Sequence, residues 1–134
     1  MSEARGYVGT RTLSVAAAPD QAFALLSDPY RLPQWAPGIA ESVAHEHEDV
    51  WRLTSASGTR LRAIRTSAAF GVVDFVSPEP GGRGLFIRVL ANAGGSELVF
   101  SMAFPPGTPQ ADIDAQMTAI ERELQTVRTL LSGY

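Results

Sequence analysis

The sequence predicts an α+β fold in which a curved, seven-stranded antiparallel sheet packs against one long C-terminal helix. Three observations predict it. Over residues 108–133, apolar residues recur at steps of three and four, which is the spacing of one helix face. Over residues 39–104, turn-forming residues separate six stretches that are typical of strands. A further alternating stretch at residues 7–15 supplies the seventh strand.

The first elements of the chain are a strand and two short helices. Polar and apolar residues alternate over 7–15, which indicates a strand. Ala18-Pro19-Asp20 then opens a short helix, because proline fits the first turn and aspartate stabilises the positive end of the helix dipole. Asp28-Pro29 ends that helix, and we expect a second short helical segment over 30–35.

Turn signals divide the next part of the chain into six strands. They fall at residues 48–49, 55–58, 68–71, 78–82 and 92–95. Because each turn is short, consecutive strands are expected to pair antiparallel. Pro105-Pro106-Gly107 ends the last strand, and Gly81 to Gly84 is interpreted as a flexible hairpin connection.

Two of these turns fix the register of their strands. The expected pairs are Val89–Leu98, Ile87–Phe100, Leu85–Met102, Ile64–Phe75 and Thr66–Val73. These residues share one face of the sheet, whereas the other face carries Arg65, Asp74, Arg88 and Glu97, with Arg65 opposite Asp74. One apolar and one charged face is typical of a half-solvated antiparallel sheet.

The strands before residue 63 fit this scheme less well. The apolar face includes Val43, His45, Trp51 and Leu53 only if the turn at Glu48-Asp49 has three residues. Arg60 and Arg62 do not fit the apolar face, and we expect them to mark a β-bulge near an opening.

The C-terminal helix is expected to run without a break from Pro109 to Ser132, with Thr108 as its N-cap and Gly133 at its end. Its apolar stripe consists of Ile113, Met117, Ile120, Leu124, Val127 and Leu131. The opposite face is expected to carry Asp112, Gln116, Glu121, Glu123, Gln125 and Arg128. Burial of the stripe against the sheet would contribute at most about 9–18 kcal/mol.

Length and composition exclude several classes of protein. The 134 residues are expected to form a single domain, 1–134. A net charge of −3 argues against nucleic-acid binding, and the lack of cysteine excludes disulfides and thiolate sites. No apolar run is long enough to span a membrane, and Met1 to Tyr7 lacks the apolar core of a secretion signal, so a cytoplasmic protein is expected.

Four segments carry a resemblance to a known superfamily. They are Ser14 to Asp28, Leu32-Pro33-Gln34-Trp35, Gly71 to Asp74 and Gly94 to Leu98. With the order of elements, they resemble the START-like, helix-grip superfamily, also called SRPBCC, and in particular its small bacterial members labelled polyketide cyclase/dehydrase. The resemblance implies the helix-grip fold, but no single activity, because the superfamily includes lipid carriers, hormone receptors and cyclases.

The resemblance also implies a hollow between sheet and helix. Because Trp35 lies in a segment flanked by prolines, where a large aromatic side chain can pack without belonging to a rigid element, we expect the segment around Trp35 to close that hollow. Its expected ligand-binding residues are Trp35, Val43, Trp51, Leu53, Ile64, Phe75, Ile87, Phe100, Met102, Met117, Ile120 and Leu124. Glu41, His45 and Arg62 are the polar groups expected to orient a ligand there. An ordinary packed core is the alternative.

Catalytic candidates are few. They are His45, Glu41, Asp74 and Arg88, of which Asp74 and Arg88 would face a cavity only if the register were shifted by one residue. His45 and His47 lack a third histidine, so no metal site is expected, and no cofactor is expected either.

These observations leave three hypotheses open. The first is a module, monomeric or homodimeric, that binds a small hydrophobic ligand, lipid-like or aromatic. The second is a polyketide cyclase or aromatase that uses the same cavity. The third is an interaction protein with a solid core.

Overall fold

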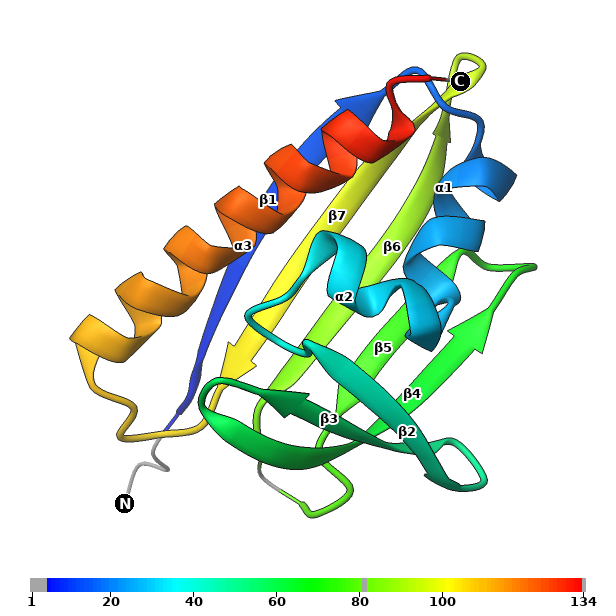
Figure 1. Cartoon of the computed structure of the whole chain (residues 1–134). Helices are drawn as coiled ribbons and strands as arrows, with labels where there is room; N and C mark the ends of the chain where they lie inside the picture. Colours follow the sequence, from blue (N-terminus) through cyan, green and yellow to red (C-terminus); the bar gives the residue numbers. More distant parts are fainter. Residues whose placement is uncertain (1–4, 81, 134) are drawn as a thin grey trace.

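The computed structural model describes residues 5–80 and 82–133 (Figure 1). Gly81, at the predicted hairpin connection, and the first four residues lie outside the described part of the chain. The elements, in order, are β1 (Tyr7–Val15), α1 (Pro19–Ser27), the 3₁₀ turn η1 (Pro29–Arg31), α2 (Leu32–Trp35), β2 (Ser42–His47), β3 (Val50–Ser55), β4 (Gly58–Ser67), β5 (Val72–Val76), β6 (Gly84–Asn92), β7 (Gly95–Phe104) and α3 (Gln110–Leu131). The predicted fold class is confirmed, including the two short helices after the first strand.

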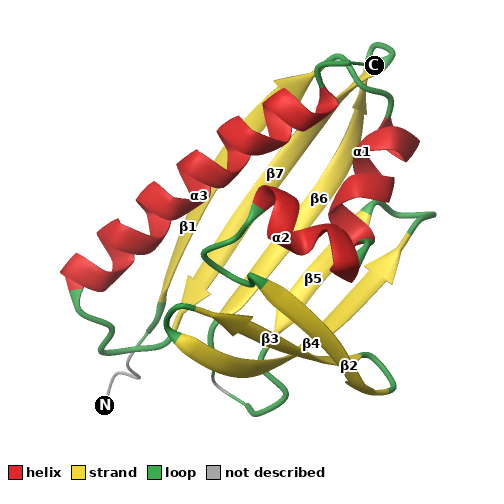
Figure 2. Cartoon of the chain, viewed as in Figure 1, coloured by secondary structure: helices red, strands yellow, loops and turns green. Residues whose placement is uncertain are grey.

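The seven strands form one antiparallel sheet in the order β1-β7-β6-β5-β4-β3-β2. Six of the seven are therefore neighbours in both sequence and space, while β1 pairs with β7 and forms one edge. The helices α1, α2 and α3 all lie on the same side of the sheet, and the sheet curves around them (Figure 2). This side is called the concave face below.

The predicted hairpin registers are confirmed. β6 and β7 pair Val89 with Leu98 and Leu85 with Met102, and the expected pair of Ile87 and Phe100 lies between them. β4 and β5 pair as expected as well, with Arg65 opposite Asp74. The strongly buried positions of β5, β6 and β7 therefore face the helices, as half-solvated sheets require.

The hairpin of β2 and β3 has the expected residue pairs on the concave face, but its turn differs from the expected one. The turn has two residues, not three, and the register shifts between His45 and His47. That β-bulge supplies the extra residue, so that Val43 still pairs with Leu53, and His45 with Trp51.

The expected bulge at Arg60 and Arg62 is wrong. β3 and β4 pair without interruption, with Arg60 opposite Leu53 and Arg62 opposite Trp51. Both arginines thus belong to the concave face without any local distortion of the strand. Their long side chains can do so because a cavity, described below, lies beside them.

The apolar stripe of α3 is confirmed, since all six of its side chains are at most 7% exposed. The predicted cap is wrong. Pro109, not Thr108, precedes the first helical residue, and the Thr108 hydroxyl donates instead to the carbonyl of Pro105, at 2.7 Å. The threonine is used in the turn from β7 into the helix and therefore does not satisfy a helix N–H group.

Glu123 is not on the exposed face of α3, as the sequence pattern suggested, but is only 8% exposed. It lies three residues after Ile120 and four before Val127, both of which are buried. On a helix such positions are neighbours on the surface, so a contact band slightly wider than the predicted stripe includes Glu123.

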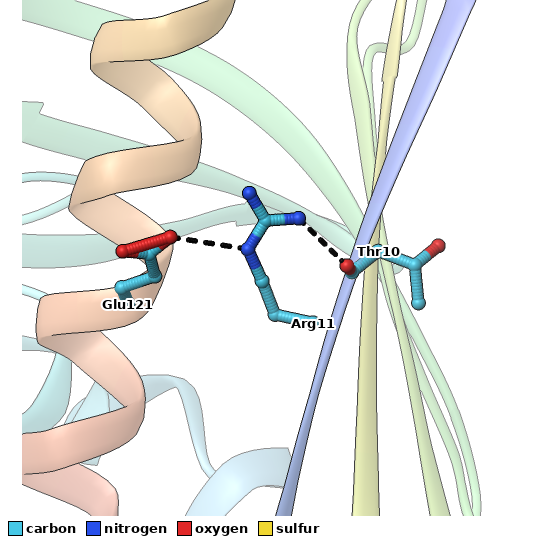
Figure 3. Close-up of polar contacts among 3 residues, drawn as sticks. All are labelled: Thr10, Arg11 and Glu121. Atoms are coloured by element: carbon cyan, nitrogen blue, oxygen red, sulfur yellow. Dashed lines mark hydrogen bonds and ion pairs between the residues drawn. The ribbon is translucent and has the colours of Figure 1, made fainter.

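The edge strand β1 holds α3 close to the sheet. A Cβ atom on Gly9 would lie 2.5 Å from the sulfur of Met117, so glycine permits the helix to approach the strand at this point. Beside it, Arg11 donates to a carboxylate oxygen of Glu121 at 3.1 Å and to the carbonyl of Thr10 at 2.9 Å (Figure 3). Because that ion pair is exposed, most of the docking energy must come from the buried stripe.

Candidate functional site

A cavity of about 200 Å³ lies on the concave face, between the sheet and the first half of α3. Its apolar lining comes from the loop after α2 and from β3, β5, β6 and β7, as Ile39, Leu53, Phe75, Leu85 and Met102. Its polar lining consists of Ser57, Arg60, Arg62, Arg83 and Gln116. Arg60 and Ser57 are exposed, so the polar part of the lining is in contact with solvent.

The sheet register builds the apolar floor. Phe75 on β5 pairs with Leu85 on β6, which pairs with Met102 on β7, so three adjacent strands place one row of side chains on the concave face. The helix α3 packs against β1 and α2, and to a smaller extent against β7. The cavity lies over this row of side chains, and α3 contributes Gln116 to its lining.

Each lining arginine is held by a local contact. Arg60 donates to the hydroxyl of Ser57 at 3.3 Å, and Arg62 donates to the carbonyl of Leu61 at 2.8 Å. The guanidinium carbon of Arg83 lies 5.7 Å from the centre of the Phe104 ring, which is the geometry of a cation–π contact.

The three arginines lack acidic partners within residues 5–80 and 82–133. Four other arginines form ion pairs in this part of the chain, as Arg11–Glu121, Arg52–Glu46, Arg65–Asp49 and Arg88–Asp74. Burial lowers the pKa of Arg62, and the positive charges of Arg60 and Arg83 lower that pKa further. The electrostatic potential at this side of the cavity is therefore positive.

The expected ligand-binding residues fall into two groups. Leu53, Phe75 and Met102 line the cavity. The remaining nine belong to the core or pack on its edge, namely Trp35, Ile64, Ile87, Phe100, Met117, Ile120, Leu124, Val43 and Trp51. Leu85 also lines the cavity; its pairing with Met102 predicts the correct face, although Leu85 is not among the expected ligand-binding residues.

Trp35 does not lie in a loop over an opening, as its flanking prolines suggested. It is the last residue of α2 and is fully buried. Its ring centre lies 6.2 Å from that of Phe75 and 5.8 Å from that of Phe100, both in edge-on orientation. Trp35 therefore joins α2 to the middle of the sheet.

The four catalytic candidates lie away from the cavity lining. His45 and Glu41 are exposed, and the His45 ring is fixed by a 2.8 Å contact of its Nε2 atom with the carbonyl of Glu48. Asp74 and Arg88 form an ion pair at 2.6 Å. The confirmed register puts that pair on the convex face, opposite the cavity.

Sequence reasoning missed one buried titratable group. Burial raises the pKa of Glu123 to about 8. Its Oε1 atom is buried and has no hydrogen-bond partner among the described residues, as is also true of the indole N–H of Trp35. The signal that could have found Glu123 is its spacing from Ile120 and Val127, if the stripe had been drawn one residue wider.

Within the described ranges, no three His, Cys, Asp or Glu side chains come close enough together to hold a metal ion. In the same part of the chain, no helix has the length and apolar character to cross a membrane.

A second hollow, of about 620 Å³, lies at the opposite end of the strands. It is bounded by the start of α1, the β4–β5 turn and the end of β6, and its lining includes Phe23, Phe70 and Leu90. Asp20 is the one charged group among its described lining residues, so this hollow has little to orient a ligand.

Comparison with known families gave one match over most of the chain. Residues 9–131 match the family described as "Polyketide cyclase / dehydrase and lipid transport". The comparison with curated proteins found no match.

Solved structures with a similar fold share little sequence with this chain. XoxI from Bacillus cereus has a TM-score of 0.76 at 17% identity, covering 92% of this chain and 94% of its own. Ara h 8.0201 has a TM-score of 0.73 at 14% identity, covering 96% and 99%. The Aha1 dimer from Colwellia psychrerythraea has a TM-score of 0.72 at 11% identity, covering 94% and 96%. At these identities the likeness concerns the fold alone.

Proposed function

Because this chain belongs to the polyketide cyclase / dehydrase and lipid transport family, we propose that it binds a small, mostly apolar molecule in the cavity on its concave face. The observation that carries the proposal is the apolar floor of that cavity. Along β7, the inward-facing Leu98 and Phe100 are fully buried, but Met102, the next inward residue, is only partly buried and lines the cavity. The core therefore stops short of filling the space beneath α3.

The size of the cavity limits the ligand. Its volume of about 200 Å³ is below the range of about 300–1,000 Å³ that is usual for sites that bury a drug-sized molecule. A single ring or a short alkyl chain fits this space, and a longer molecule would extend through the polar side. The flexible side chain of Met102 suits ligands of differing shape.

The lining favours binding over catalysis. A cyclase or aromatase needs a group that accepts a proton beside the reacting carbon. Among the described lining residues, arginine supplies the charged groups, and arginine does not act as a base at neutral pH. The cyclase alternative would therefore need His45 or Glu41 to reach the ligand from outside the lining.

A neutral probe tests the proposed function. We expect 1-octanol to bind with a Kd in the micromolar range, which corresponds to about 8 kcal/mol. Replacing Met102 with tryptophan should abolish this binding, because the larger side chain fills the space that the alkyl chain would occupy. Isothermal titration calorimetry measures the affinity for 1-octanol of the unmodified protein and of Met102→Trp.

The matched control is Thr12→Trp, which adds the same side chain at an exposed position on the convex face of β1. This variant should bind 1-octanol as the unmodified protein does. A second variant, Leu53→Phe, narrows the cavity from β3 if Met102→Trp fails to fold. The proposed function would be contradicted if the unmodified protein did not bind 1-octanol. It would also be contradicted if the cavity variants that fold bound 1-octanol as tightly as the unmodified protein does.

A further inference from the structure

The cavity has an electrostatic character that its apolar floor does not explain. It is lined by Arg60 and Arg62 of β4 and by Arg83, the residue that precedes β6. Its described lining contains no Asp or Glu. Three like charges gather in this way in a chain whose net charge is −3.

We propose that the ligand carries an oxyanion group, a carboxylate or a phosphate, that Arg60, Arg62 and Arg83 bind while its apolar part lies on Leu53, Phe75 and Met102. This inference rests on the proposed function, because it names the chemical class of the ligand for the same cavity.

The donors of the arginines are available for such a group. A guanidinium has five N–H donors and binds carboxylate or phosphate in a planar, two-pronged geometry. Within the described residues, Arg60 and Arg62 each donate one hydrogen bond to a protein oxygen outside their own residue, at Ser57 and Leu61. The guanidinium carbon of Arg83 lies 5.7 Å from the centre of the Phe104 ring, and a cation–π contact does not use up the N–H donors of the guanidinium.

The placement of the arginines also favours an anion over water alone. Arg62 is half-buried and has no acidic partner among the described residues, and burial together with the charges of Arg60 and Arg83 lowers its pKa. An oxyanion beside Arg62 would offset both the cost of burying its charge and the repulsion from Arg60 and Arg83. By contrast, Arg65 on the outer face of the same strand pairs with Asp49 and needs no ligand.

The geometry matches an amphiphilic molecule and not a free ion. Arg60 donates a hydrogen bond to the exposed residue Ser57, while Phe75 and Leu85 in the floor are at most 4% exposed. A head group held by the arginines thus directs its chain onto the floor, and charge-assisted hydrogen bonds fix its orientation.

Matched probes test the inference by calorimetry. Octanoate and octyl phosphate should bind at least about tenfold more tightly than 1-octanol at low ionic strength, since hydrogen bonds to charged groups are strong enough for that ratio. Added salt should reduce the ratio because it screens the arginines. Acetate and inorganic phosphate, which lack the alkyl chain, should bind much more weakly than the octyl compounds.

The variant Arg62→Gln should remove the preference for octanoate over 1-octanol. Its control is Arg65→Gln on the convex face, which should keep the full preference. Arg62→Gln should not lower the melting temperature of the ligand-free protein, because it removes a charge that is partly buried beside two others. Should that variant nevertheless unfold, Arg83→Gln is measured in its place.

The outcomes separate the two proposals. Equal binding of octanoate and 1-octanol, or a preference that survives both Arg62→Gln and Arg83→Gln, overturns the anionic ligand and leaves the apolar site standing. Inorganic phosphate that binds as tightly as octyl phosphate also overturns it, because the chain would then contribute nothing. Failure of every octyl compound to bind overturns the proposed function as well.

Discussion

Replacing Glu123 with leucine is expected to stabilise the protein by several kcal/mol at about pH 9 and by much less at about pH 5. The side chain is only 8% exposed, and its Oε1 atom has no hydrogen-bond partner among the described residues. Ionising such a carboxyl group is costly, and burial accordingly raises its pKa from 4.5 to about 8.

The direction of the pH effect follows from that pKa. Below about pH 4.5 the carboxyl group is protonated in both the folded and the unfolded chain, so no charge is buried. Between 4.5 and about 8 the unfolded chain loses the proton and the folded chain keeps it, so stability falls as pH rises. Above that range the loss is constant. The separation between the two pKa values, 4.5 and about 8, corresponds to a loss of unfolding free energy of at most about 5 kcal/mol.

Urea denaturation at the two pH values measures the effect as a difference between proteins, which cancels the other titrating groups. Glu123→Gln keeps the shape of the side chain but cannot ionise. Like Glu123→Leu, it should therefore lack the decrease in unfolding free energy that the carboxyl group causes between the two pH values. If Glu123→Gln and the unmodified protein show the same change in unfolding free energy between the two pH values, the carboxyl group is not buried as described.

Replacing Trp35 with alanine is expected to cost about 3–5 kcal/mol of unfolding free energy. The ring is fully buried and lies edge-on to both Phe75 and Phe100. Removing it leaves a hole in the core where α2 meets the sheet, and aromatic contacts of this kind add to the loss.

Denaturant unfolding followed by far-ultraviolet circular dichroism measures the cost without relying on tryptophan emission. Trp35→Phe is the control and should cost clearly less, because it keeps an aromatic ring and the indole N–H has no partner to lose among the described residues. A cost below about 1 kcal/mol for Trp35→Ala would instead indicate a loosely packed lid, as the flanking prolines first suggested.

The fold could be predicted because its signals are local. A short turn fixes which residues of two strands lie opposite each other, and the alternation of side chains then assigns every residue to a face. This reasoning placed Ile64 opposite Phe75 and Leu85 opposite Met102 correctly. The helix period likewise found all six buried residues of the α3 stripe.

The two departures in α3 have different causes, one in packing between elements and one in a local turn. Glu123 looks exposed when α3 is viewed alone, and its burial depends on what packs beside the stripe. Thr108 looks like a cap until the turn from Pro105 takes up its hydroxyl. At Glu123 tertiary packing outweighed the local pattern, whereas at Thr108 a competing local hydrogen bond, to the carbonyl three residues earlier, replaced the cap.

The position of the cavity was beyond the sequence pattern because it too depends on packing between elements. The sequence pattern of an apolar face is the same whether a residue packs against another side chain, as Phe100 does, or borders a cavity, as Met102 does. What distinguishes them is what packs on each position from elsewhere in the chain: the Trp35 ring lies 5.8 Å from that of Phe100, whereas Met102 borders the cavity. The misfit of Arg60 and Arg62 was the one local sign of an opening.

A map of backbone amide chemical shifts with saturating 1-octanol tests the cavity most directly. Binding on the concave face should shift the β3–β4 hairpin, the start of β6 and the end of β7, around Arg60, Leu85 and Met102. Shifts centred instead on Phe23 and Phe70, at the second hollow, or no shifts at all, would contradict a binding site beneath α3.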